Sequence, residues 1–97
     1  MNAVSGAAAP RIGFVGVLVS DRERSAAAVN RVLSDHAAII RARLGVPWKD
    51  RDLAVVTLVV EATTDEVGAL AGSLGRIPGV SVKTGLAPER RQEGSAV

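Results

Sequence analysis

The sequence predicts an α+β domain in which one antiparallel sheet of four strands carries two helices on a single face. Four runs rich in valine, isoleucine and leucine and two runs with helical apolar spacing follow one another in the order β-α-β-β-α-β. The chain has 97 residues, a length that suits one domain. The first and third β runs are apolar at nearly every position, as central strands are, whereas the second and fourth alternate, as edge strands do.

The first strand, residues 11–19, leads into a turn that predicts the start of a helix. Ser20 and Glu23 have the spacing of a capping box, in which the two residues bond each other's backbone N–H groups. The helix that follows carries one continuous apolar face, formed by Val29, Val32, Leu33, His36 and Ala37.

The second strand, residues 39–46, is expected to alternate between the two faces of the sheet. The polar residues 49–52, after Gly45 and Pro47, predict a turn. The expected sides of the strand are Ile40, Ala42 and Leu44 on one, and Arg41 and Arg43 on the other.

The third strand, residues 53–62, is the strongest in the chain. Thr63 and Glu66 repeat the capping-box spacing and predict the second helix. Its apolar face consists of Val67, Leu70, Ala71 and Leu74. After the Pro78-Gly79 turn the last strand is expected to place Val80 and Val82 inward, with Ser81 and Lys83 outward.

This element order predicts a ferredoxin-like, ACT-like domain. Right-handed crossovers between the two halves give the strand order 4-1-3-2, with both helices on one face. The ordered domain is expected to span residues 11–87. Residues 1–10 and 88–97 lack periodicity and are expected to be disordered tails.

The composition excludes several functional classes. The chain has no cysteine, so it forms no disulfide, thiolate zinc site or iron–sulfur cluster. One Phe, one Trp and no Tyr leave few rings on which bases could stack. The net charge is +2 and the basic residues are scattered, which disfavours nucleic acid as a partner of this chain alone. The longest apolar run, residues 53–60, is too short to cross a membrane, and no signal peptide is present, so we expect a soluble, cytoplasmic protein.

No catalytic or metal-binding constellation stands out. His36 is the single histidine and has no ligand-type neighbour at metal spacing except Asp35, which points elsewhere on the helix; we interpret it as structural. Asp50 and Asp52 alternate with basic residues, as in a solvated turn. We therefore expect no enzyme, no cofactor and no metal.

Two places are candidates for a small ligand. The first is the turn formed by Ser20, Asp21 and Arg22, where helix N-terminal amides can meet an anion. The second is the cleft that edge-strand pairing between subunits would create around Arg41, Arg43 and Lys83. For each, the alternative is a solvated surface without a ligand.

The third strand predicts self-association. It is apolar on both faces, yet helices cover only one face in this architecture, so Val55 and Val59 are expected at an interface. Gly68 and Gly72 are further candidates, because glycine in a helix interior permits close approach of another backbone. The alternatives are that the tails or residues 46–52 cover the sheet, and that the glycines, with Gly75 as a C-cap, are fortuitous.

Residues 68–84, GALAGSLGRIPGVSVKT, resemble the signature of a small bacterial family of proposed regulators of the iron-only hydrogenase system, the TM-type hydrogenase regulators. The turn at residues 20–23 and Gly45-Val46-Pro47 are similar to that family as well, so the resemblance covers nearly all of residues 11–87.

The resemblance implies an ACT-like fold similar to the regulatory domain of nickel-responsive repressors, assembly into dimers or tetramers, and a role in regulating or maturing hydrogenase. The chain lacks the His/Cys cluster and the ribbon-helix-helix segment of those repressors. Asp21-Arg22-Glu23 also replaces the proline–glycine turn of amino-acid-binding ACT domains. We therefore predict a homo-oligomeric regulatory module that binds a small-molecule effector or a partner protein. The alternatives are a DNA-associated transcriptional regulator and a structural assembly domain without a ligand.

Overall fold

The structure, a computed structural model, describes residues 9–88, so most of the two predicted tails lies outside the described residues. Short 3-10 turns precede and follow the second strand, at Ala37–Ile39 and Lys49–Arg51. The helices and strands are β1 (Arg11–Ser20), α2 (Arg22–Asp35), β2 (Ile40–Trp48), β3 (Leu53–Ala62), α3 (Thr64–Gly75) and β4 (Val80–Leu86).

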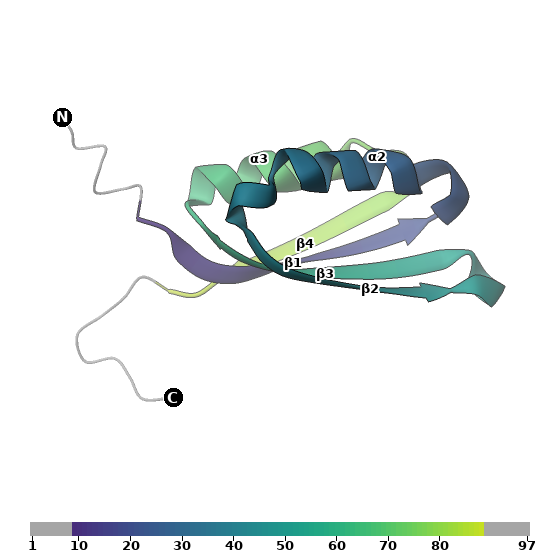
Figure 1. Ribbon diagram of the computed structural model, residues 1–97, viewed down its shortest axis with the longest axis horizontal. Helices are drawn as coiled ribbons and strands as arrows, with labels where there is room; N and C mark the ends of the chain where they lie inside the picture. The colour runs from purple at the N-terminus through teal and green to yellow at the C-terminus, as the bar shows by residue number, and fades with distance from the viewer. Residues whose placement is uncertain (1–8, 89–97) are drawn as a thin grey trace.

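The four strands form one antiparallel sheet in the order β2-β3-β1-β4, and both helices lie on the same face of it (Figure 1). This confirms the predicted ferredoxin-like arrangement, with β1 and β3 central and β2 and β4 at the edges. Within residues 9–88, the opposite face of the sheet carries no helix (Figure 1).

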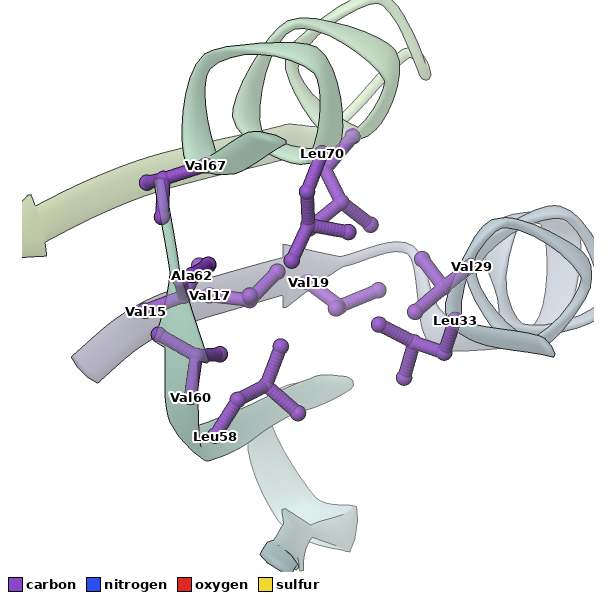
Figure 2. Close-up of a cluster of buried hydrophobic side chains, with 11 residues drawn as sticks. Val15, Val17, Val19, Val29, Leu33, Leu58, Val60, Ala62, Val67 and Leu70 are labelled. Carbon is purple, nitrogen blue, oxygen red and sulfur yellow. The ribbon is translucent and has the colours of Figure 1, made fainter. Parts of the chain in front are cut away.

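The core lies between the sheet and the two helices (Figure 2). It is built almost wholly from valine and leucine, and each of these side chains contributes about 1.5–3 kcal/mol when fully buried. The buried side chains are Val15, Val17 and Val19 of β1, Leu58, Val60 and Ala62 of β3, Val29 and Leu33 of α2, and Val67, Leu70 and Leu74 of α3.

Strand β2 differs from the predicted alternation. The register shifts between Ile40 and Ala42, so Ile40 pairs with the buried Val60 and packs against the core, whereas Ala42 pairs with the exposed Val59. A bulge of this kind adds one residue to one strand and reverses the faces of those beyond it. The strand also runs on through Pro47, which an edge strand tolerates because it needs no N–H donor there.

The two helix starts differ from each other. At α3 the predicted capping box is present: the Glu66 N–H donates to Thr63 Oγ1 at 3.1 Å, and the Thr63 N–H donates to Glu66 Oε1 at 2.9 Å. The capping box predicted from Ser20 and Glu23 is wrong. Asp21 is the N-cap of α2, without a side-chain cap, because the Ser20 hydroxyl donates to the Gly79 carbonyl instead.

Helix α2 ends at Asp35, so Ala37 is exposed in the following 3-10 turn and does not extend the apolar face as predicted. His36 is the C-cap, and its Nδ1 lies 2.9 Å from the Val32 carbonyl oxygen. This local contact fits the predicted structural role of the histidine. The buried face of α2 begins instead with Ser25, which is 4% exposed.

Candidate functional site

Three connections of the chain meet at the end of β1. The Ser20 N–H and hydroxyl donate to the Gly79 carbonyl at 2.8 and 2.9 Å, which ties β1 to the α3–β4 turn. The Asp21 N–H donates to the Asp52 carbonyl at 3.2 Å, which ties the start of α2 to the β2–β3 turn. Segments far apart in the sequence therefore share one backbone network.

This junction also holds the three described residues with positive φ. Asp21 has φ 58°, Asp52 has φ 51° and Gly79 has φ 80°. The left-handed region costs most side-chain-bearing residues about 1–2 kcal/mol, and aspartate tolerates it better than most. Gly79 is required on a second ground, because a Cβ there would lie 2.9 Å from the Ser20 carbonyl oxygen. Strained backbone of this kind concentrates at functional sites.

A pocket of about 320 Å³ opens beside the junction, and we call it the turn pocket. It combines a carboxylate, a guanidinium and backbone groups with an apolar side, so its chemistry suits a small ligand with polar and apolar parts. Its lining consists of Asp21, Arg24, Ser25, Ala28, Ile77, Pro78 and Gly79.

Some polar groups of the turn pocket are engaged in hydrogen bonds within the protein, and others are exposed to solvent. Ser25 is buried, and its hydroxyl donates to the Pro78 carbonyl at 2.9 Å, so it holds the pocket wall in place. The Asp21 carboxylate makes no cap bond to α2 and lies 3.5 Å from an Arg24 guanidinium nitrogen. Both of these charged side chains are substantially exposed, so they remain accessible to a ligand.

Two further hollows offer less varied chemistry. One of about 420 Å³ is lined by Arg24, Ala27, Ala28, Arg31 and Val32, all from α2. A smaller one, of about 180 Å³, lies beside Arg43 at the end of α2. Neither brings a carboxylate and a turn backbone together, so the turn pocket is the stronger candidate.

The structure places only part of the first predicted ligand site in this pocket. Asp21 lines it, whereas the Ser20 hydroxyl is engaged with Gly79 and Arg22 is absent from the lining. Pro78 and Gly79 had signalled only a turn in the sequence. Their place beside α2 depends on a contact between residues 53 positions apart, Ser25 and Pro78, which no local pattern reveals.

The second predicted ligand site is not assembled within one chain. Arg41 forms an ion pair with Glu61, and Arg43 donates to Asn30 Oδ1 at 3.0 Å. Lys83 lies on β4, at the edge of the sheet opposite β2. A cleft joining the three basic residues therefore stays a prediction that requires a second subunit.

The face of the sheet away from the helices is strongly apolar, and we call it the open face. The register puts Phe14 opposite Val59, and Leu18 opposite Val55, on this side. Val55 and Val59, predicted at an interface, thus both lie on it. Seven large side chains of the open face are 39–66% exposed: Ile12, Phe14, Leu18, Leu44, Val46, Trp48 and Val59.

Among residues 9–88, the space beside the glycines of α3 is open. A Cβ at Gly68, Gly72 or Gly75 would meet nothing within 4 Å. Gly75 is the last residue of α3 rather than its cap, which is Arg76. Contact of Gly68 and Gly72 with another copy of the chain requires a second subunit and stays a prediction.

Two features are absent from residues 9–88, a metal-ligand cluster and a membrane-spanning helix. In this stretch no group of three or more His, Cys, Asp or Glu side chains is arranged to hold a metal ion. Across the same residues, neither helix combines the length and apolarity that crossing a membrane would take.

Comparisons with known proteins place these features in a family. The sequence model of the TM1266-like family, described as "Iron-only hydrogenase system regulator, putative", matches residues 11–84. The uncharacterized protein TM1266 from Thermotoga maritima has a similar structure, with a TM-score of 0.78 and 35% sequence identity over 81% of this chain and 99% of that chain. A search among curated proteins finds no match.

More distant structures share the fold alone. A formyltetrahydrofolate deformylase from Pseudomonas putida KT2440 matches with a TM-score of 0.57 and 12% identity, over 82% of this chain and 30% of that chain. SnoaB, a cofactor-independent oxygenase from Streptomyces nogalater, matches with a TM-score of 0.53 and 15% identity, over 90% of this chain and 100% of that chain.

Proposed function

This chain belongs to the TM1266-like family of iron-only hydrogenase system regulators, and from that membership we propose that it is a non-catalytic regulatory module that binds a small ligand in the turn pocket. The observation that carries the proposal is the junction at the end of β1. There a carboxylate that no helix cap uses, Asp21, stands on a left-handed residue beside Arg24.

The chemistry of the pocket favours binding over catalysis. Its lining contains neither histidine nor cysteine. The Ser25 hydroxyl donates its hydrogen to a backbone carbonyl, so it lacks the adjacent base that an activated nucleophile needs. Asp21 and Arg24 can instead recognise opposite charges on one small molecule, with Ala28 and Ile77 as the apolar side.

The backbone network links the turn pocket to the β2–β3 turn. A ligand held by Asp21 acts on a residue whose N–H is bonded to the Asp52 carbonyl. Asp52 directly precedes β3, and the 3-10 turn before it follows Trp48, a residue of the open face. A ligand shifts a conformational equilibrium only if it binds one conformation more tightly than the other. A ligand that favours one geometry of the Asp21–Asp52 hydrogen bond would therefore move the β2–β3 turn.

The absence of cysteine from the sequence suits a reducing compartment, and we propose the cytoplasm as the place of action.

A thermal-shift screen of purified protein against a library of small metabolites tests the proposal. We expect at least one compound to raise the melting temperature of the wild type, because a ligand that binds only the folded state stabilises it. Asp21→Asn should abolish that response, since asparagine tolerates the left-handed conformation but removes the charge.

Asp52→Asn is the matched control, because it makes the same change at the other left-handed aspartate, outside the pocket lining. It should keep the response. An equal response in all three proteins, or none in the wild type, would contradict the proposed site.

A further inference from the structure

We infer that the open face is the contact surface between two copies of this chain, packed sheet against sheet about a two-fold axis. The open face shares no residue with the lining of the turn pocket, so this interface is separate from the proposed ligand site. The occupant is a second copy of the chain, because the apolar area, the charge and the surface shape of the open face all suit an identical partner.

The area of the open face fits a dimer rather than a monomer. Seven large apolar side chains there are 39–66% exposed, and at roughly 100 Å² each they approach the ~800 Å² per partner of a standard interface. The largest apolar patch on a typical monomer is about 300–600 Å². Three strands contribute to it, so the face is continuous across most of the sheet.

The charge of the open face is compatible with an identical partner. Two copies of one surface bring like charges together, so a charged face would repel itself. On the strands, the register places Glu61 and Lys83 on this side, and Glu61 is neutralised by its ion pair with Arg41. Lys83 stands on the edge strand β4, away from the centre. The middle of the face is therefore neutral.

The surface of the open face is uneven along the central strand β1, where exposed side chains flank a glycine. Gly16 lies between Phe14 and Leu18 on the same side, and a Cβ at Gly16 would meet nothing closer than the Lys83 carbonyl oxygen at 3.9 Å. The Phe14 ring lies over Gly85 of β4, where a Cβ would collide with it. A side chain of the second copy can therefore enter the gap at Gly16, and the reverse contact follows by symmetry.

The edges of the sheet are less suitable for the same purpose. On β2 the bulge at Ile40–Ala42 and Pro47 interrupt a regular ladder with another strand. Pairing through β4 would also leave the apolar face uncovered. A face-to-face contact buries the whole patch in one step.

Size-exclusion chromatography with light scattering at micromolar concentration tests this inference. The wild type is expected as a dimer or a tetramer. Val59→Glu places a charge on the open face opposite Phe14, and should at least halve the molar mass. Leu44→Ser, at a side chain 66% exposed, should weaken assembly without burying a charge. Circular dichroism confirms that each variant is folded.

Ala26→Glu on the exposed surface of α2 is the control and should keep the wild-type mass. A monomeric wild type, as expected if another segment of the chain covers the face, would overturn the inference. Unchanged mass in folded Val59→Glu and Leu44→Ser would overturn it too. Asp21→Asn should leave the mass unchanged, so a failure of the ligand site is distinguishable from a failure of the interface.

Discussion

The Ser25 hydroxyl donates a hydrogen bond of 2.9 Å to the Pro78 carbonyl. This contact joins the first turn of α2 to the turn between α3 and β4. Together with the bonds from Ser20 to Gly79 it brings the two halves of the βαββαβ fold into contact at one end of the sheet. The turn pocket exists because these turns are held side by side, so its stability and the ligand affinity proposed for it depend on the same few bonds.

Ser25→Ala should lower the free energy of unfolding by about 1 kcal/mol, because it removes a hydrogen bond from a buried site. Urea unfolding followed by circular dichroism measures the change. Ser34→Ala, at an exposed position of the same helix, should change stability by less than about 0.5 kcal/mol. Equal effects of the two substitutions would show that the bond to Pro78 contributes nothing.

Gly79→Ala should destabilise the protein by about 1–3 kcal/mol, since alanine must adopt a positive φ and its Cβ would crowd the Ser20 carbonyl. Gly68→Ala is the contrasting change. Its Cβ would enter open space within α3, and the substitution should stabilise the helix by up to about 1 kcal/mol. Thermal unfolding of both variants checks the pair, and the same sign for both would refute this reading of the two glycines.

Thr63→Ala removes the side chain that caps α3 and should cost about 1 kcal/mol of stability. Thr64→Ala changes the neighbouring, exposed first residue of the helix and should have a much smaller effect. Chemical denaturation gives the free energy of unfolding of each variant. The difference between them separates the loss of the cap from the effect of replacing any threonine by alanine. If Thr64→Ala proved the more damaging, the assigned start of α3 would be wrong.

Trp48 offers an intrinsic probe of assembly, because it is the chain's single tryptophan and lies on the open face with 45% exposure. In Val59→Glu its fluorescence emission should shift to the red relative to the wild type, as the indole becomes more hydrated. Quenching by acrylamide should increase in parallel. Identical spectra and quenching in the two proteins would place Trp48 outside any contact between copies.

Much of the fold was predictable from short-range patterns. The apolar runs on β1 and β3 identified the central strands, and Thr63 with Glu66 identified the start of α3. These signals are local, so they require no knowledge of the tertiary structure. The bulge in β2 was missed because residues 40–44 alternate regularly in sequence, and the register shift appears only in the pairing with β3.

The start of α2 shows why the candidate site was harder to predict. Ser20 has the right spacing for a cap, yet its hydroxyl bonds Gly79, 59 residues away. Arg24 and Ser25 carried no motif, and their role appears only when Pro78 is placed beside them. Of the open face, only the part on β3 was predictable. That strand is apolar on both sides while helices cover one side only, which indicated Val55 and Val59. Ile12, Phe14, Leu44 and Trp48 joined it only once the register was known.

Native mass spectrometry of protein purified under non-denaturing conditions tests the central claim directly, namely that the turn pocket binds a small molecule and the open face binds a second chain. One spectrum reports both the number of chains and any bound small mass. The wild type should appear as a dimer or tetramer that carries a small molecule. Asp21→Asn should lose the small molecule and keep its chain number, whereas Val59→Glu should lose partner chains. A wild-type spectrum that contains only the bare single chain would contradict both the regulatory ligand site and the face-to-face assembly.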